Sequence, residues 1–568
     1  MTVAVGYPGT PSTEILEAMS AYRDAVYCEW SPNEKVALEV AAGASLAGAR
    51  CIVTMKHVGL NVAADPLMTL SYTGTVGGLV LCVADDPGMH SSQNEQDTRH
   101  FARFAKVPVL EPADSADASE FMKLALDVSE RHRTPVILRT TTRVSHSRGM
   151  VETGDRVPSG KPIGFQKCPE RFVPIPLWGR GMRVEVEKRH AALRAEAEKT
   201  AANRIEWGDR SLGIVAEGIA YQYVRELLPD ASVLKIGWAW PFPDALLREF
   251  AGGVKELLVA EELDDIMEEH LRSLGIACEG KKYFTPIGEF SPDRIREGLA
   301  RRAGKPVTPP ASLPEAKDLP ARPPVLCPGC PHRGLFYALG KFDVVVTGDI
   351  GCYSLGVFPP LSRIDTILCM GAGISMAHGM NKAGEPRKVV GIVGDSTFFH
   401  SGITGLLDIG YNRSASIIVV VDNRTTAMTG HQDNPGTGRT LSGEETTKAS
   451  IEEFARACGI PNVRTVNPYE TKRTVEVFKE AMASKEPWLI VSSSPCPLRE
   501  KRKLGATRSV DRTLCTKCRM CLKMGCPAIE WTPEGATVNE LLCSGCGLCA
   551  GVCPSKAFVI AEKGGCAQ

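Results

Sequence analysis

Eight of the nine cysteines in the last 54 residues constrain the fold of this chain more than any other feature. They form two runs, in each of which three cysteines stand two residues apart and a fourth, followed by proline, comes later: Cys515, Cys518, Cys521 and Cys526, then Cys543, Cys546, Cys549 and Cys553. Three thiolates at this spacing fold around one face of a cubane, and the remote cysteine before proline completes the neighbouring cluster. The pattern therefore predicts a small C-terminal domain with two [4Fe–4S] clusters.

On this crossed pattern one cluster is held by Cys515, Cys518, Cys521 and Cys553, and the other by Cys543, Cys546, Cys549 and Cys526. The first run departs slightly from the bacterial ferredoxin spacing, because four residues rather than three precede Cys526. Structural zinc and a disulfide scaffold are the alternatives. Zinc knuckles usually show two Cys-x-x-Cys pairs rather than two triplets that each have a trailing Cys-Pro.

The composition bounds the class of protein. The chain has 568 residues, room for three to five domains, and its 43% hydrophobic content allows sizeable cores. Lysine plus arginine and aspartate plus glutamate are both 66, and no basic tract is long enough to indicate a nucleic-acid surface. We see no secretory signal and no apolar stretch approaching a membrane span of roughly 18 residues. Twenty cysteines without a leader indicate metal chemistry in a reducing compartment, so we expect a cytoplasmic protein.

Short apolar runs alternate with helical patterns in three regions, which predicts α/β domains around parallel sheets. Residues 182–204 are rich in charge and alanine and predict a solvated helix, whereas residues 303–331 hold nine prolines and predict a stiff linker. The expected order is an α/β domain at 1–150, a charged helical linker at 151–205, a second α/β domain at 206–302, a proline-rich linker at 303–326, a third α/β domain at 327–497, a charged linker at 498–512 and the cysteine-rich domain at 513–568.

Two neighbouring strands of the third α/β domain are expected to end in metal-binding side chains. Residues 388–393 predict a buried strand that is followed by Gly394, Asp395 and Ser396, and a strand at 417–421 is followed by Asp422 and Asn423. A strand, a crossover helix and a parallel strand place both strand ends at one edge of the sheet, where open α/β sheets bind ligands. The oxygens of Asp395 and Asn423 could then share Mg²⁺, although a Gly-Asp pair after a strand is common by itself.

This pair of turns resembles the thiamine diphosphate motif, a Gly-Asp-Gly run followed downstream by Asn-Asn. Ser396 replaces the last glycine and Asp422 replaces the first asparagine, but both presumptive metal ligands are retained. The resemblance implies that Asp395, Asn423 and the backbone carbonyl of Thr425 bind Mg²⁺. Gly394 and Ser396 complete the cofactor-binding loop.

Over essentially its full length the chain resembles the α subunits of indolepyruvate:ferredoxin oxidoreductases, a family of the 2-oxoacid:ferredoxin oxidoreductase superfamily. The resemblance rests on five stretches: residues 6–12 (GYPGTPS), 56–61 (KHVGLN), 327–333 (CPGCPHR), the Gly394-Asp395 motif and the double cysteine run. It implies transketolase-like parallel-sheet domains: a pyrimidine-binding domain at 1–150, a transketolase C-terminal-like domain at 206–302 and a diphosphate-binding domain at 327–497. A ferredoxin domain of the bacterial two-cluster type follows.

The same resemblance assigns roles to residues of the first domain. Glu34 matches the glutamate that bonds the aminopyrimidine ring of the cofactor and stabilises its imino tautomer, a proton relay to the reacting carbon. Thr10 matches a hydroxyl beside cofactor and substrate. Arg99 aligns with an arginine for the substrate carboxylate, which suits bidentate binding. His57 could also face the site, but a lone histidine is more often structural.

Four further cysteines predict a third cluster near the thiamine motif. Cys327 and Cys330 form a Cys-x-x-Cys pair, Cys352 follows in a Gly-Cys turn that matches relatives in the superfamily, and Cys496 is a plausible fourth ligand. By the resemblance they would bind a proximal [4Fe–4S] cluster. A redox dithiol and a cofactor-binding loop without metal are the alternatives.

The resemblance implies a CoA-dependent oxidative decarboxylation of aryl 2-oxoacids, such as indolepyruvate or phenylpyruvate, to the aryl-acetyl-CoA and CO₂, with electrons passed to an external ferredoxin. A smaller β subunit that carries the superfamily's γ domain is expected, in a dimer of αβ units. Two rival functions stay open: a thiamine-dependent arylpyruvate decarboxylase with idle clusters, and a non-catalytic electron-transfer subunit. Both halves of a thiamine site on one chain argue against the second.

Overall fold

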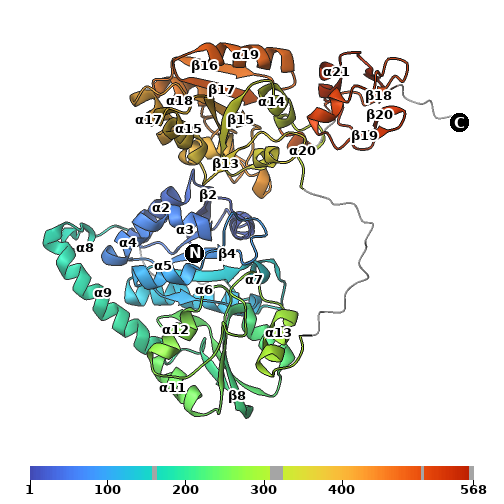
Figure 1. The fold of residues 1–568 in the computed structure, drawn as a ribbon. Helices are drawn as coiled ribbons and strands as arrows, with labels where there is room; N and C mark the ends of the chain where they lie inside the picture. The colour runs from blue at the N-terminus through green and yellow to red at the C-terminus, as the bar shows by residue number, and fades with distance from the viewer. Residues whose placement is uncertain (156–162, 308–323, 501–503, 562–568) are drawn as a thin grey trace. The chain divides into compact units, whose positions relative to one another are not determined.

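The computed structural model describes residues 1–155, 163–307, 324–500 and 504–561 (Figure 1). By its internal contacts the chain divides into two compact units, Met1–Lys317 and Asp318–Gln568, which we describe separately. Most of the expected proline-rich linker, residues 308–323, lies outside the described residues. Within the described ranges, no helix has both the length and the apolar character needed to cross a membrane.

The first unit contains a seven-stranded sheet with the order β10-β5-β6-β4-β3-β1-β2. Neighbouring strands run parallel except for the antiparallel pair of β10 and β5. β3 and β4 are buried at every position, which explains their nearly continuous apolar sequence. The strands are β1 (Val3–Gly6), β2 (Tyr27–Trp30), β3 (Cys51–Lys56), β4 (Leu79–Asp85), β5 (Val109–Leu110), β6 (Val136–Thr141) and β10 (Trp238–Trp240).

Several helices of this domain begin at a side-chain cap. The side chains of Asn33, Asp97 and Asp114 accept hydrogen bonds from backbone N–H groups in the first turns of α2, α5 and α6. The cap at Asn33 makes Glu34 the first residue of α2. The helices are α1 (Thr13–Ser20), α2 (Glu34–Leu46), α3 (His57–Val62), α4 (Ala64–Thr73), α5 (Thr98–Ala105), α6 (Ser115–His132) and α7 (Thr142–His146).

The second α/β domain has a four-stranded sheet with the order β11-β8-β9-β7. It is connected to the first domain, because β10 lies within its sequence range but pairs with β5. Its elements are β7 (Arg204–Glu206), β8 (Asp209–Glu217), α10 (Gly218–Leu227), β9 (Ala231–Ile236), α11 (Asp244–Gly252), β11 (Leu257–Ala260), α12 (Ile266–Ser273) and α13 (Pro292–Arg302).

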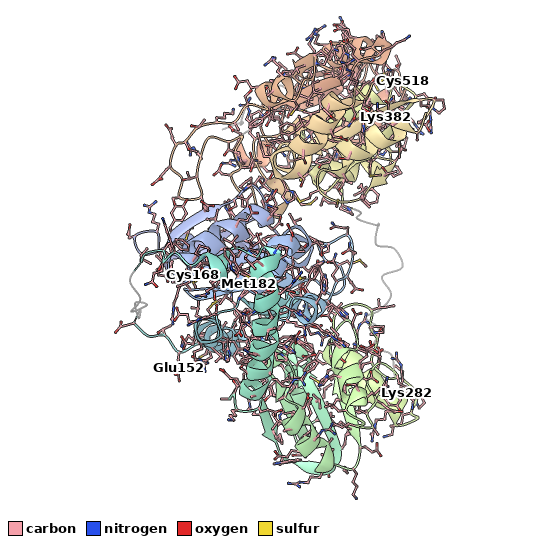
Figure 2. All side chains as sticks on the ribbon, turned by 90° about the vertical axis from the view of Figure 1, so that its left-hand side faces the viewer. Glu152, Cys168, Met182, Lys282, Lys382 and Cys518 are labelled. Carbon is pink, nitrogen blue, oxygen red and sulfur yellow. The ribbon has the colours of Figure 1, made fainter. Side chains whose placement is uncertain are left out.

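The expected charged helix is present and connects these two domains. After a short turn, α8 (Pro169–Phe172), α9 runs from Pro176 to Ala197 and so begins before the expected residue 182. Its buried stripe, which includes Met182, faces α4, and the carboxylate of Glu198 just beyond it accepts from the backbone of Ala245 and Leu246 in α11 (Figures 1 and 2). The charged linker is therefore a strut within the first unit.

The second unit is built around a six-stranded parallel sheet with the order β13-β12-β14-β15-β17-β16. The chain turns through α16 (Asp395–Thr397) and a π-helical turn, η2 (Phe398–Gly402), directly after β14. Such π-turns are frequent at functional sites. The remaining elements are α14 (His332–Leu339), β12 (Val344–Gly348), η1 (Cys352–Val357), β13 (Thr366–Ile367), α15 (Ala372–Lys382), β14 (Lys388–Gly394), α17 (Ile403–Tyr411), β15 (Ile417–Asp422), η3 (Ala427–Thr429), α18 (Ile451–Ala457), β16 (Asn462–Val466), α19 (Thr471–Ala483), β17 (Trp488–Ser493) and α20 (Pro497–Glu500).

The cysteine-rich tail belongs to this second unit and packs on its α/β domain. Met524, Leu548 and Val552 form an apolar cluster with Tyr337 and Tyr469 of the α/β domain. The tail is therefore docked and not merely tethered by its charged bridge. It consists of two antiparallel strand pairs, β18 (Arg508–Val510) with β21 (Phe558–Ile560) and β19 (Ile529–Thr532) with β20 (Gly535–Val538), together with η4 (Met520–Met524) and α21 (Leu548–Val552).

Candidate functional site

The carboxyl ends of β14 and β15 bring Asp395 and Asn423 together. Gly394 is in register with Val421, so the turns after both strands lie at one edge of the sheet. The backbone N–H of Thr425 donates to Asp395 Oδ2 at 3.1 Å and to Asn423 Oδ1 at 3.2 Å. Two oxygens of the kind that Mg²⁺ prefers therefore converge on one amide, as the sequence had predicted.

The carboxylate of Asp395 is buried without a cationic partner among the groups that act on it most. Burial and the neighbouring carboxylate of Asp422 raise its pKa to about 7. Its hydrogen-bond donors are neutral: the amide of Thr425 and, at 3.4 Å, the side chain of Asn434. A buried carboxylate in this setting is stabilised by a bound cation, so the donor set fits Mg²⁺. Asn434 was not predicted, because nothing in its local sequence marks it.

The loop is completed by Ser396, whose Oγ accepts a hydrogen bond at 3.0 Å from Thr426 Oγ1. Arg499 of α20 donates to Thr425 Oγ1 at 2.8 Å and forms an ion pair of 2.6 Å with Asp433. Arg499 belongs to the stretch that the sequence had placed in the charged linker. It instead supports the loop that carries Thr425.

Cys352 lies near Cys327 and Cys496, and Cys330 lies near Cys352 and Cys327, beside this motif. Burial, followed by the thiols of Cys327 and Cys496, raises the pKa of Cys352 to about 11, and Asp395 contributes to the same shift. Burial also raises the pKa of Cys330, with contributions from Cys352 and Cys327. The structure thus brings together the four cysteines of the expected proximal cluster.

A backbone hydrogen bond joins this cysteine group to the motif at the end of β15. The N–H of Cys496 donates to the carbonyl of Asn423 at 3.0 Å, and its thiol lies 3.6 Å from His431 Nε2. One residue of the expected cluster is therefore bound directly to one residue of the expected Mg²⁺ site.

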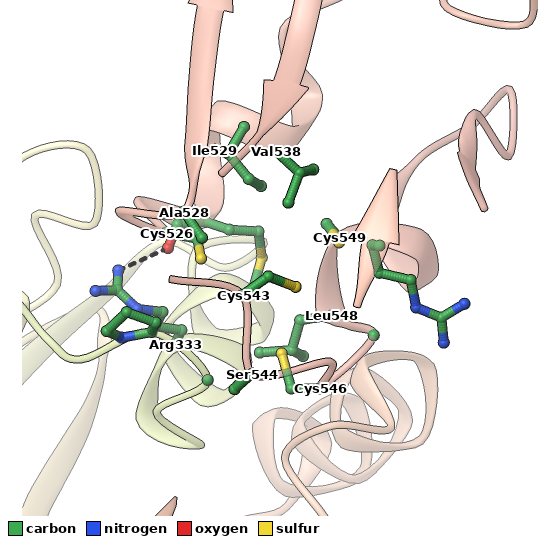
Figure 3. A pocket seen from close by; sticks show the side chains of 15 residues that line it. Arg333, Cys526, Ala528, Ile529, Val538, Cys543, Ser544, Cys546, Leu548 and Cys549 are labelled. Carbon is green, nitrogen blue, oxygen red and sulfur yellow. Dashed lines mark hydrogen bonds between the residues drawn. The ribbon is translucent and has the colours of Figure 1, made fainter. Parts of the chain in front are cut away.

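In the tail, Cys553 lies near the first triplet of cysteines, and Cys526 lies with the second triplet. Burial and the thiols of Cys518 and Cys553 raise the pKa of Cys521, so the remote Cys553 adjoins the first triplet. The second group shares a single cavity, lined by Cys526, Cys543, Cys546 and Cys549 (Figure 3).

This cavity has features that fit an anionic cluster. Arg508 lines it, and the Nε atom of Arg508 is buried without a hydrogen-bond partner in the described residues. Four thiols, two glycines and six apolar residues form most of the remaining wall. In the part of the chain that the structure describes, no three His, Cys, Asp or Glu side chains converge on a point for one metal ion. The ligands of a cubane each bind a different iron, so four thiols need only surround a common volume.

In the first unit Glu34 is buried at the start of α2. Gly59 in α3 lies against it, and a Cβ placed on Gly59 would stand 2.5 Å from Glu34 Oε1. The carbonyl of Thr10, next to a cis proline, accepts from Ser91 Oγ at 3.1 Å. His57 is buried with its Nε2 at 3.3 Å from the carbonyl of Asn94. Glu34 and His57 thus lie on neighbouring helices.

Lys56 is a further buried group in this region that the sequence did not single out. Burial lowers its pKa to about 8, against the opposing charge of Asp86 at 3.7 Å. Its ammonium group donates to the carbonyl of Ser91 at 2.6 Å. The motif at residues 56–61 contained it, but only the fold shows that its side chain is buried.

Arg99, which the resemblance assigns to the substrate carboxylate, lies in a buried network of ion pairs. Its side chain is 1% exposed and forms ion pairs with Asp97 at 2.6 Å, Glu261 at 2.7 Å and Glu217. Two backbone carbonyls in the loop before α12 take further N–H groups. Because its donors are committed to these partners, the guanidinium is not placed to bind a substrate carboxylate. It joins the first two domains of the chain.

Comparisons with known proteins agree with this arrangement. Residues 1–172 match the family "Pyruvate flavodoxin/ferredoxin oxidoreductase, thiamine diP-bdg", residues 349–492 match "Thiamine pyrophosphate enzyme, C-terminal TPP binding domain", and residues 536–559 match "4Fe-4S binding domain". Together with the fold, these matches define a thiamine diphosphate-dependent iron–sulfur enzyme of the 2-oxoacid:ferredoxin oxidoreductase superfamily.

Relatives extend over nearly the whole chain. An indolepyruvate oxidoreductase subunit IorA from Methanothermobacter marburgensis is 43% identical over 98% of this chain and 94% of its own length. That of Pyrococcus abyssi is 42% identical over 99% of this chain and 94% of its own length. The chain belongs to the IorA family of indolepyruvate oxidoreductase subunits. A 2-oxoglutarate:ferredoxin oxidoreductase structure from Magnetococcus marinus covers 53% of this chain and 62% of its own, with 16% identity and a TM-score of 0.43.

Proposed function

We propose that this chain is the catalytic α subunit of an enzyme that oxidatively decarboxylates aryl 2-oxoacids, indolepyruvate among them, to aryl-acetyl-CoA and CO₂, and reduces ferredoxin. The observation that carries the proposal is the hydrogen bond from Cys496 to Asn423. It ties the candidate ligands of an iron–sulfur cluster to the diphosphate-binding turn, so that electrons leaving the cofactor would have a fixed first acceptor. A simple decarboxylase has no need of this connection.

Thiamine diphosphate, when bound, supplies the electron sink for decarboxylation of a 2-oxoacid. Asp395 and Asn423 would hold its diphosphate through Mg²⁺, with the carbonyl of Thr425 as a further ligand. Glu34 would bond the aminopyrimidine ring and hold the proton that maintains its imino form. Thr10 would present its hydroxyl beside the substrate.

The chain would bind three [4Fe–4S] clusters, one by each of the three cysteine groups. Anaerobic preparations should then contain about twelve irons per chain, four per cluster. Cys496→Ser should lower the content to about eight, because the proximal cluster loses a ligand. The control is Cys458→Ser, which removes a buried thiol on the far side of the same domain and should leave the content unchanged. A wild-type value near eight would show that the proximal group does not hold a cluster.

The proposed assembly includes a smaller β subunit, in a dimer of αβ units in the cytoplasm, with an external ferredoxin as the acceptor. Its activity is testable with the co-purified complex under anaerobic conditions. Indolepyruvate, phenylpyruvate and phenylglyoxylate would be compared with pyruvate and 2-oxoglutarate, each with CoA and ferredoxin. We expect CoA-dependent ferredoxin reduction with the aromatic oxoacids. Aldehyde release without reduced ferredoxin would indicate a decarboxylase, and a complex without thiamine diphosphate would indicate an electron-transfer subunit.

A further inference from the structure

Arg333 is a buried cation at the junction between the α/β domain and the cysteine-rich tail. It lies in the first turn of α14 and is 2% exposed. Its Nε donates to the carbonyl of Cys327 at 3.1 Å and its Nη2 to that of Leu326. Its Nη1 donates to the carbonyls of Met524, at 3.1 Å, and Gly525 in the tail. All four acceptors are neutral, so the hydrogen bonds leave its positive charge uncompensated.

The charge of Arg333 faces thiols from two different cysteine groups. In the described residues it forms no ion pair with a carboxylate; burial lowers its pKa, and the thiols of Cys330, Cys526, Cys327 and Cys546 oppose that shift. Two of these belong to the proximal group and two to the second tail group. Arg333 is therefore placed between them.

The two groups are brought close by the loop that connects Cys327 with Cys330. Pro328 and Gly329 of this loop, together with Arg333, line the cavity of the second tail group (Figure 3). Gly329 has a φ of +73°, and a Cβ on it would meet Ser544 Oγ at 2.1 Å. Only glycine allows so close an approach of one cysteine loop to the other. No carboxylate is among the residues that line this wall.

We propose that Arg333 is a shared positive charge for two iron–sulfur clusters, the proximal one and that of Cys526, Cys543, Cys546 and Cys549, and that it raises the reduction potential of both. Each cluster becomes more negative when it gains an electron, and a nearby buried cation favours that state. The inference rests on the proposed occupancy of these two sites. Arg333 acts through the clusters and is a positioning residue.

The test is a redox titration of the anaerobically purified complex, followed by electron paramagnetic resonance of the reduced clusters. Arg333→Gln keeps donors for the carbonyls but removes the charge, whereas Arg333→Lys keeps the charge with fewer donors. In Arg333→Gln, the ratio of oxidised to reduced cluster at a fixed potential should rise roughly tenfold or more for two of the three clusters. Tenfold corresponds to 59 mV for a one-electron couple. Arg333→Lys should restore most of the shift.

A matched control separates this effect from the loss of any nearby cation. Arg508→Gln removes the second arginine that lines the tail cavity, which among the described residues has no hydrogen bond or ion pair with the Cys327–Cys330 loop, so it should shift one couple and not two. The cluster of Cys515, Cys518, Cys521 and Cys553 should keep its potential in all Arg333 variants. Unchanged potentials in Arg333→Gln, or equal shifts in the Gln and Lys variants, would overturn the proposal. So would the loss of iron from both variants, which would leave Arg333 with a purely structural role.

Iron analysis of the wild-type complex keeps the two proposals apart. A wild-type chain with fewer than about twelve irons would contradict the three-cluster assignment itself. A fully loaded wild type whose potentials do not respond to the charge at Arg333 would contradict only the inference about this residue.

Discussion

At the scale of single residues, the proposed decarboxylation depends on polar side chains that the fold itself buries. Asp395 is a carboxylate enclosed among neutral donors, and Glu34 is enclosed behind a glycine. Burial of such groups costs free energy unless a partner compensates for it. Asp395 therefore has a testable requirement for a bound cation.

Asp395→Asn should abolish the retention of Mg²⁺ and thiamine diphosphate. The amide preserves the shape but has no charge to offer the metal, and we expect affinity to fall by at least about 100-fold. Calorimetric titration of the complex with cofactor and Mg²⁺ measures this directly. Asp408→Asn is the control, since that carboxylate in α17 is about half exposed and should be indifferent to the change. Cofactor affinity equal to that of the wild type would remove Asp395 from the metal site.

Glu34→Gln should retain the cofactor but lose turnover. The amide cannot hold the proton that the aminopyrimidine ring requires, so the rate should fall on the order of 10²-fold or more. Turnover with an aryl 2-oxoacid and cofactor content are both measured on the anaerobic complex. Glu39→Gln, on the same helix but exposed in a pair with Lys35, should keep normal turnover. Equal activity of the two variants would make Glu34 an ordinary structural acid.

At the scale of elements, the strands that carry the metal motif were predictable to within a residue. β14 and β15 begin where expected and end one residue later, because long runs of valine and isoleucine between turn residues have few alternative structures. The crossed grouping of the tail cysteines was also predictable, because their spacing leaves a compact cluster domain little freedom. The contact of α3 with the start of α2 was not predictable, since the two helices are joined only by tertiary packing.

Gly59→Ala tests that contact between helices. The added methyl group would stand 2.5 Å from Glu34 Oε1 and 2.7 Å from its Cγ, so the carboxylate must move. Turnover should fall at least about tenfold, since a small misplacement of a catalytic group is costly. Gly43→Ala is the matched control: it lies inside α2 with nothing within 4 Å of the new Cβ and should stabilise the helix by up to about 1 kcal/mol. Both effects are measured by steady-state kinetics and thermal unfolding. Full activity of Gly59→Ala would show that Glu34 tolerates displacement.

At the scale of the whole molecule, the order of the domains along the chain could be predicted from the sequence, but the contacts that connect the domains could not. The proline-rich and charged stretches marked transitions along the chain, yet α9 proved to be a strut, and β10 and Arg99 connect domains that the pattern had separated. Such joints depend on residues more than a hundred positions apart, which no local pattern records. The resemblance gave Arg99 a role in substrate binding that its surroundings do not support.

Arg99→Met tests the structural role of this joint. The substitution leaves the buried carboxylates of Asp97, Glu217 and Glu261 without their cation, and we expect about 3–5 kcal/mol of destabilisation. Arg103→Met, one turn later in α5 and about half exposed, should cost less than about 1 kcal/mol. Urea unfolding measures both. If Arg99→Met is stable and instead raises the KM for the oxoacid, the residue binds substrate after all.

The pairing of β10 with β5 has a consequence for fragments of this chain. A strand that belongs in sequence to the second α/β domain closes the edge of the sheet of the first, beside β5. Removing residues 206–302 would expose the hydrogen-bonding edge of β5, a surface that invites pairing with another chain. A fragment that ends at residue 205 should therefore aggregate, whereas one that carries residues 1–302 keeps this edge covered. The two domains therefore fold as a pair.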